Sequence, residues 1–162
     1  MIVVSDTSPI TNLAAIDHLN LLRQLYRTVV IPTAVFEELT MAGDDIPGCQ
    51  EVQAASWITV KSVENSQLVA TLQEQLGPGE SEAIALALEL KSDWLLMDEA
   101  LGRAIAATRQ IRITGILGVL IESKHRGLIA DVKPLLDQLI EQADFWVDQR
   151  LYTRVLETVE EV

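Results

Sequence analysis

Short apolar runs that alternate with helix-forming segments are the feature of this sequence that most restricts its fold. Each run has the length of one strand and is apolar almost throughout. Strands of this kind, separated by helices, are typical of a parallel sheet that helices cover on both faces. The sequence therefore predicts an α/β fold with a central parallel sheet. The predicted strands are residues 2–5, 28–31, 57–61, 94–97 and 111–113.

The segments between and after these strands contain strong helix formers. The clearest loop is GDDIPG at residues 43–48, where glycine, aspartate and proline occur together. With 162 residues the chain has the length of one domain. We expect residues 1–140 to form the α/β domain and residues 141–162 to form a C-terminal helical extension of the same domain. The predicted helices are residues 8–16, 19–26, 33–42, 49–56, 65–76, 80–91, 99–110, 115–127, 132–143 and 148–162.

Composition excludes several classes of protein. The only cysteine, Cys49, rules out an internal disulfide and a cysteine zinc site, and it fits a reducing cytoplasm. No apolar run approaches the roughly 20 residues of a membrane span, and no basic segment precedes the first apolar run as in a secretory signal. The net charge of −12 disfavours a broad basic surface for nucleic acid. It permits a nuclease whose acids bind a divalent metal, because the metal reverses the local charge.

Acidic residues directly follow two of the predicted strands. Asp6 comes after the strand at 2–5, and Asp98 comes after the strand at 94–97. In parallel α/β sheets, functional groups collect beyond the carboxyl ends of the strands. We therefore expect Asp6 and Asp98 to lie at the same edge of the sheet.

The lengths of one helix and one strand bring a third acid to this edge. A helix over 80–91 travels roughly 17 Å at 1.5 Å per residue. The strand at 94–97 returns roughly 13 Å at 3.3 Å per residue. The chain between Glu80 and Asp98 therefore comes back to the edge at which it started. Glu82, in the same first helical turn, is an alternative to Glu80 that the sequence leaves open.

A fourth acid is expected from the helix that follows Pro32. This helix descends from the same edge, and helical side chains tilt toward the N-terminus of their helix, so Glu37 or Glu38 would reach back toward it. Val35 and Leu39 form one apolar pair four residues apart, which does not choose between the two acids. The residues alone leave this choice open.

Three or four carboxylates without matching bases repel one another, and the repulsion raises their pKa values. A hard divalent cation with oxygen ligands, Mg²⁺ or Mn²⁺, relieves it. Such an ion orients water, lowers the pKa of that water and stabilises charge on a phosphodiester. The only histidines, His18 and His125, lie beside none of these strand ends, which disfavours a histidine mechanism. Taken singly, the same acids also suit helix caps and helix dipoles.

Several motifs together resemble the PIN-domain superfamily, the metal-dependent ribonucleases that include VapC-like toxins of toxin–antitoxin pairs. The motifs are IVVSDTSPITNLAAI, VVIPTAVFEEL and LGPGESEAIALALELKSDWLLMDEALGRAIA, and RITGILGVLIESKHRGLI continues the match. The resemblance covers the first 140 residues and looks closest to a little-characterised prokaryotic branch of short, stand-alone PIN proteins. It implies a PIN-like three-layer α/β/α fold.

The resemblance also implies roles for individual residues. The implied catalytic set is Asp6, Glu38, Glu80 and Asp98, and the implied ligands of Mg²⁺ or Mn²⁺ are Asp6, Glu80 and Asp98. Two positions depart from the family pattern, since Glu80 stands where an aspartate is usual and Leu96 where a threonine is usual. The implied auxiliary residues are Thr7, Ser8, Glu82, Glu99 and Thr114.

The function that the resemblance implies is hydrolysis of RNA phosphodiesters by metal-activated water. An antitoxin protein that blocks the site and a homodimer are further family properties. A catalytically silent module that holds RNA or a protein partner is the alternative. A magnesium-dependent phosphatase is a third hypothesis, but it requires a second aspartate in a D-x-D pair, and DTS at residues 6–8 supplies none.

Overall fold

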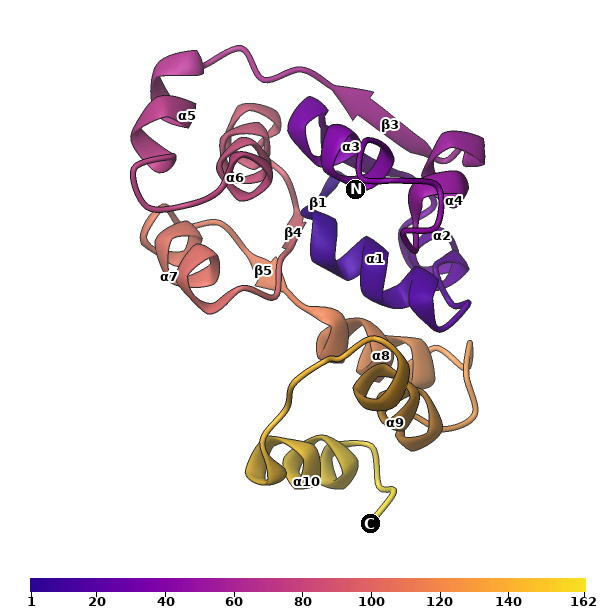
Figure 1. The fold of residues 1–162 in the computed structure, drawn as a ribbon. Helices are drawn as coiled ribbons and strands as arrows, with labels where there is room; N and C mark the ends of the chain where they lie inside the picture. Colours follow the sequence, from indigo (N-terminus) through magenta and orange to yellow (C-terminus); the bar gives the residue numbers. More distant parts are fainter.

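A five-stranded sheet occupies the centre of the computed structural model, which describes residues 1–162 (Figure 1). Its strands follow the order β3-β2-β1-β4-β5, and every neighbouring pair is parallel. The predicted α/β fold with a central parallel sheet is therefore confirmed. The strands are β1 (Val3–Ser5), β2 (Val29–Pro32), β3 (Ile58–Lys61), β4 (Trp94–Leu96) and β5 (Ile113–Thr114).

Ten helices connect and follow the strands, and each overlaps a predicted segment. Two of them end four residues earlier than predicted, and the others end within two residues of the predicted position. Helix α5 ends at Leu72, because residues 73–76 form a turn before Gly77. Helix α10 ends at Thr158, and Glu160 adopts a left-handed conformation (φ 60°) just beyond it. The helices are α1 (Thr7–Ala15), α2 (Asn20–Tyr26), α3 (Thr33–Thr40), α4 (Cys49–Ala54), α5 (Ser66–Leu72), α6 (Pro78–Leu90), α7 (Ala100–Thr108), α8 (Ile116–His125), α9 (Lys133–Gln142) and α10 (Gln149–Thr158).

The last strand lies nearer to the carboxyl edge than predicted. The sequence predicted a strand over 111–113, whereas β5 consists of Ile113 and Thr114. These two residues pair with Leu95 and Leu96 of β4. The register of the short strand β4, rather than the apolar run itself, therefore sets the extent of β5.

Alternating side chains along the strands divide the core into two clusters. Val3 and Leu96 belong to the larger cluster, which also contains the buried faces of α1, α2, α8 and α9. Val4 and Leu95 belong to the smaller cluster, which contains the buried residues of α6. Because successive residues of a strand point to opposite faces, helices cover both sides of the sheet.

Helix α6 is surrounded on nearly every side, and its sequence explains why. Every residue from Ala83 to Ala87 is buried, because α6 packs against β1, β2, β4 and the helices α3, α5 and α7. Pro78 stands at its start, and Lys91 ends it in a left-handed conformation (φ 50°). Since α6 leads into the parallel strand β4, its N-terminus lies at the carboxyl edge of the sheet (Figure 1).

Helices α9 and α10 pack beside α8, at the lower end of the molecule in Figure 1. Leu136 and Leu139 of α9 and Val155 of α10 are buried in the larger apolar cluster, so both helices share the core of the sheet. The predicted boundary at residue 140 falls inside α9, and the division of the chain there stays a prediction. None of the ten helices combines the length and the apolar composition needed to cross a bilayer.

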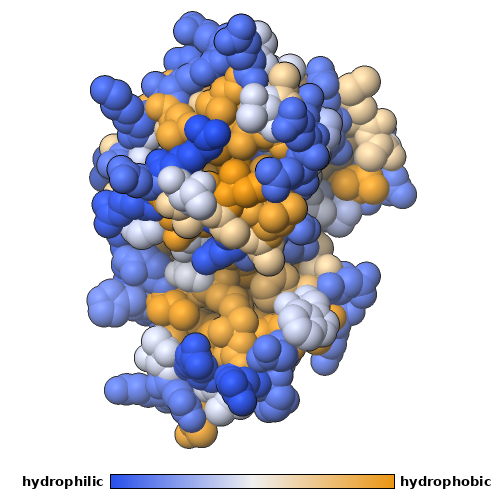
Figure 2. All heavy atoms as spheres, turned by 90° about the vertical axis from the view of Figure 1, so that its left-hand side faces the viewer, coloured by the Kyte–Doolittle hydropathy of each residue, from blue (hydrophilic) through white to orange (hydrophobic).

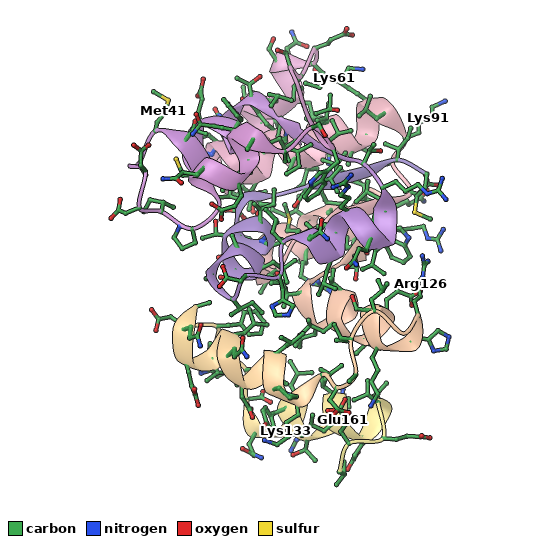
Figure 3. The ribbon with its side chains drawn as sticks, turned by 90° about the vertical axis from the view of Figure 1, so that its right-hand side faces the viewer. Met41, Lys61, Lys91, Arg126, Lys133 and Glu161 are labelled. Carbon is green, nitrogen blue, oxygen red and sulfur yellow. The ribbon has the colours of Figure 1, made fainter.

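The carboxylate of Glu161 joins the segment after α10 to the start of α9. Glu161 and Lys133 lie together in the lower part of the molecule (Figure 3). The side chain, 7% exposed, accepts hydrogen bonds from the backbone N–H groups of Val132 (2.6 Å) and Lys133 (2.8 Å) and from the ammonium group of Lys124 (3.0 Å). Desolvation raises the pKa of Glu161, but these hydrogen bonds outweigh it and hold the pKa below its usual value.

We expect Glu161→Gln to lower the free energy of unfolding by about 1–3 kcal/mol at neutral pH, because charge-assisted hydrogen bonds to buried groups are lost. The pKa of Glu161 is lowered in the folded state, so its contribution is present above the unfolded pKa and is lost as pH falls through the folded pKa. Urea unfolding at several pH values measures both effects. The matched control is Glu160→Gln, an exposed neighbour without a side-chain hydrogen bond. Equal destabilisation by the two substitutions would contradict this account.

Candidate metal centre

The pairing of β1 with β4 brings two aspartates to one edge of the sheet. Ser5 lies opposite Leu96, and the backbone N–H of Asp6 donates to the carbonyl oxygen of Leu96 (2.9 Å). Asp98 follows two residues after Leu96. The chain leaves β1 toward β2 on one side, whereas β4 pairs with β1 on the other. The carboxyl edge between β1 and β4 is thus a topological switch point, where α/β sheets form ligand crevices.

Asp6 is a buried carboxylate in acidic surroundings. The residue is only 3% exposed, and no side-chain hydrogen bond reaches its carboxyl group. Desolvation is the largest effect and raises the pKa of Asp6 to about 7, although the backbone N–H of Thr7 opposes it. Three nearby carboxylates raise it further, those of Glu80, Glu38 and Glu99. Ionised Asp6 therefore lacks a positive partner in the protein itself.

The carboxylate of Glu38 lies between the starts of α1 and α6. It accepts a hydrogen bond from the backbone N–H of Gly79 (3.0 Å) and another from the hydroxyl group of Thr7. Glu37 is exposed and has no such partner. Of the two acids that the sequence left open, the structure thus turns Glu38 toward Asp6.

Glu80 projects from the third position of α6. Desolvation has the largest effect and raises the pKa of Glu80, and the charge of Glu99 raises it further. The backbone N–H of Gly77 lowers this pKa, and the charge of Glu38 raises it. Glu99, the residue before α7, is exposed. Sequence analysis assigned Glu99 only an auxiliary role, yet its charge affects both Asp6 and Glu80.

Asp98 lies at the same edge but has different neighbours. Its carboxylate accepts the backbone N–H of Ile116 at the start of α8 (3.1 and 3.3 Å). Desolvation raises the pKa of Asp98, whereas Ile116 and the guanidinium of Arg103 lower it and Glu99 raises it. Neither Asp6 nor Glu80 contributes to this shift. The edge therefore has two parts, a group of Asp6, Glu38, Glu80 and Glu99, and a separate position for Asp98.

Arg103 is a site residue that sequence analysis missed. Its guanidinium donates to the carbonyl oxygen of Met97 (2.8 Å) and lies beside Asp98. The sequence feature that could have revealed it is its position four residues after Glu99 in a predicted helix. This spacing directs the side chain of Arg103 back toward the N-terminus of that helix.

Three glycines lie close to three of the carboxylates. A Cβ atom at Gly79 would lie 2.6 Å from Glu38 Oε1, and one at Gly102 would lie 3.0 Å from Glu80 Oε2. A Cβ atom at Gly115 would collide with Asp98 Oδ1 and lie 2.9 Å from Arg103 Nη1. Cβ atoms do not approach other atoms as closely as they would at Gly79 and Gly115, so these two glycines permit the observed positions of Glu38 and Asp98. At Gly102 the nearest atom is Met97 Sδ (2.7 Å), and the approach to Glu80 is tight rather than forbidden.

The remaining auxiliary residues are placed differently. Glu82 accepts a hydrogen bond from the backbone N–H of Ala34 (3.1 Å) at the start of α3, and its charge does not contribute to the pKa shift of Asp6. Ser8 Oγ is buried without a hydrogen-bond partner two residues after Asp6. Thr114 Oγ1 lies against Gly118 and lines a groove that begins at Asp98.

The donor set suits a hard divalent ion, although the side chains do not enclose one as they stand. No three of the Asp, Glu, His and Cys side chains are arranged to hold one ion. Mg²⁺ usually keeps several waters and binds proteins through only one or two carboxylates. Asp6 and Glu80, whose pKa values are raised by burial and by other acids, have the oxygen donors and the unbalanced negative charge that such an ion requires.

A parallel sheet with an acidic centre at its carboxyl edge defines a class of α/β protein suited to divalent metal. Within this class, the chain belongs to the PIN-domain family described as DUF3368, whose profile matches residues 2–161. PIN domains are generally nucleases and typically use divalent metals.

One solved structure supports the fold independently. It is a PilT N-terminus domain protein, SSO1118, from the hyperthermophilic archaeon Sulfolobus solfataricus P2. The two chains are 21% identical, and the similarity covers 76% of this chain and 93% of the archaeal one with a TM-score of 0.53. No curated protein is significantly similar to this chain.

Burial of ionised Asp6 should destabilise the metal-free protein. Because its pKa is about 7 in the folded state and 3.8 in the reference state, the penalty is absent below about pH 4 and complete above about pH 7. In EDTA at pH 8, Asp6→Asn should therefore raise the free energy of unfolding by up to about 4 kcal/mol. Thermal or urea unfolding measures this gain, which should disappear below about pH 4. Asp45→Asn in an exposed loop is the control, and a gain that does not change with pH would refute the explanation.

Gly115→Ala should weaken Mn²⁺ binding by roughly ten- to a hundredfold, since the new methyl group displaces Asp98 and Arg103. The backbone at Gly115 is extended (φ −115°, ψ −170°), so alanine is not strained there. Gly77→Ala is a matched control, because Gly77 is also extended and its Cβ would lie 3.7 Å from Glu80, an ordinary contact. Isothermal titration calorimetry measures both affinities. Equal affinity of the two variants would remove Asp98 from the metal centre.

Proposed function

We propose that this protein is a metal-dependent endoribonuclease that hydrolyses RNA phosphodiesters, of the VapC-like type. The observation that carries the proposal is Asp6, a buried carboxylate at the switch point of a PIN-domain sheet. Three further acids surround it and no base of the protein balances them. A buried carboxylate beside like charges is costly in a folded protein, and a cation that the reaction uses accounts for it.

Asp6, Glu80 and Asp98 are the residues that would hold Mg²⁺ or Mn²⁺. When bound, the ion supplies an activated water and stabilises negative charge on the phosphodiester. Glu80 is already close enough to Asp6 for its charge to raise the pKa of that buried carboxyl. Asp98 is included among these ligands because it follows β4 at the same edge and lies near Glu99.

Other residues of the chain position these acids. Glu38, held by Gly79 and Thr7, connects the starts of α1 and α6, and its carboxylate lies near enough to Asp6 to raise the pKa of Asp6. The backbone N–H of Ile116 holds Asp98 in one orientation, and the charge of Arg103 lowers the pKa of that carboxyl. The N-terminus of α8 and the guanidinium group also provide the positive charge that favours a phosphate at this edge.

Partners follow from the same proposal. The substrate is RNA, and a VapC-like protein would be the toxin of a toxin–antitoxin pair that works as a homodimer in the cytoplasm. The net charge of −12 supports a basic protein partner such as an antitoxin.

A second candidate function is a catalytically silent module that holds RNA or a protein. Two observations favour it. The acids do not form a ready three-ligand set, and the carboxylate of Asp98 is already bonded to Ile116 and lies beside Arg103. The two candidates differ in one property, metal-dependent turnover.

Cleavage of a mixed single-stranded RNA pool, with Mn²⁺, Mg²⁺ or EDTA, tests the proposal. We expect cleavage with either metal and none in EDTA. Asp6→Asn and Asp98→Asn should each reduce the rate at least about a hundredfold, because loss of even an outer partner of a metal ligand costs ten- to a hundredfold. Glu37→Gln, an exposed neighbour of Glu38, should cleave like the unchanged protein.

Circular dichroism confirms that each variant is folded. Cleavage that persists in both aspartate variants would place the activity elsewhere or in a contaminant. If the unchanged protein binds Mn²⁺ but cleaves no RNA, and generic phosphate esters are also untouched, the silent module replaces the ribonuclease.

A further inference from the structure

A groove of about 520 Å³ runs from the candidate metal centre to the C-terminal helix. Asp98 and Arg103 lie at one end, and Trp146 and Arg154 lie along the side formed by α10 and the segment before it. Figure 2 shows a recess on this side of the molecule, with apolar residues at its floor and hydrophilic residues around it. Neither the metal centre nor the core of the protein accounts for two exposed side chains of this groove, Trp146 and Arg154.

Trp146 is the most unusual of these side chains. It is 81% exposed and is the only aromatic residue among the exposed large hydrophobic side chains. Trp94 differs, because the guanidinium of Arg112 covers its ring at 4.8 Å. Tryptophan is enriched at binding interfaces, and Trp146 stands at the edge of a groove rather than alone on an open surface.

The segment that carries Trp146 is anchored on both sides. The backbone N–H of Phe145 donates to the carbonyl oxygen of Leu139 (3.0 Å), and Phe145 packs against the larger core cluster. On the other side, Asp148 caps α10 by accepting the backbone N–H of Leu151 (2.7 Å). Trp146 is thus presented from a fixed position at the edge of the groove.

The charge of the groove differs from that of the whole chain. The protein has twice as many acidic as basic residues, 24 against 12. Among the residues that line the groove, the bases are Arg103 and Arg154, and the only acid is Asp98. An exposed aromatic ring and two arginines in one groove are the combination by which proteins bind single-stranded nucleic acid, since bases stack on the ring and phosphates pair with the arginines.

We propose that this groove binds single-stranded RNA beside the cleavage site, with one base stacked on Trp146 and the adjoining phosphates at Arg154 and Arg103. The proposal rests on the ribonuclease function, because the groove leads to Asp98. A duplex does not fit this chemistry, since its bases are already stacked and paired. The occupant is therefore an unpaired strand, and the binding depends little on base identity, because every base has a stacking face.

Binding is measured by fluorescence anisotropy of a labelled, unpaired RNA of about ten nucleotides, in EDTA so that no cleavage occurs. Trp146→Ala should weaken binding by roughly 5- to 100-fold, the usual cost of losing one stacked base. Trp146→Phe should restore most of the affinity, because it keeps a stacking ring. Arg154→Ala should weaken binding and reduce the salt dependence by about one charge. The matched control is Arg150→Ala, which removes the same charge from an exposed position of α10 outside the groove.

A blunt RNA duplex provides a second control, since its weaker binding should not respond to Trp146→Ala. If single-stranded RNA binds the unchanged protein and the Trp146→Ala and Arg154→Ala variants equally, the groove proposal is overturned. The ribonuclease proposal survives that result as long as Mn²⁺-dependent cleavage is observed. If the unchanged protein binds no RNA in EDTA, the groove proposal also fails, and cleavage with Mn²⁺ then decides the ribonuclease proposal separately.

Sedimentation of the unchanged and Trp146→Ala proteins tests the main competing occupant, a second copy of this chain. A dimer that Trp146→Ala dissociates, with no change in RNA binding, would assign the groove to self-association and overturn the proposal.

Discussion

The parallel pairing of β1 with β4 is the interaction on which the rest of the structure depends. It places Ser5 opposite Leu96, fixes the backbone of Asp6 against that strand and brings Asp98 to the same edge. It also determines where α6 must start, because this helix has to cover the sheet and then lead into β4. The acids of the centre therefore meet because the sheet has this order, and a different partner for β1 would separate them.

The same pairing stabilises the core and destabilises the carboxylate at its edge. The apolar strands and α6 stabilise the fold by removing a large apolar surface from water. At their carboxyl ends they also remove Asp6 from water, which raises its pKa to about 7. A core built only for stability would have an apolar or amide side chain there. Gly79 and Gly115 agree with this, since a Cβ atom at either position would collide with the carboxylate of Glu38 or of Asp98.

Much of the fold was predictable because its signals are local. Strand runs, helix starts at proline or glycine and the turn at 43–48 depend on neighbouring residues, and the structure contains all the predicted strands and helices. The errors lie at ends, where distant partners decide. Strand β5 is Ile113–Thr114 rather than 111–113 because its length depends on β4. For the site, spacing could place acids at the correct edge, since helix rise and strand rise are constant. It could not show that Arg103 lies beside Asp98, because that contact depends on how α7 and α8 pack.

The sequence by itself determined that helices would cover a parallel sheet and that acidic residues would follow its strands, because apolar periodicity and residue order are properties of the chain. Only the tertiary structure decided which acids share surroundings. Glu38 rather than Glu37 turns toward Asp6, Glu82 binds the start of α3, and Asp98 is held apart by Arg103 and α8. Adjacent acids on a helix differ by about 100° in direction, so the packing of each helix on its neighbours, which no local pattern encodes, selects the side chain that reaches the centre.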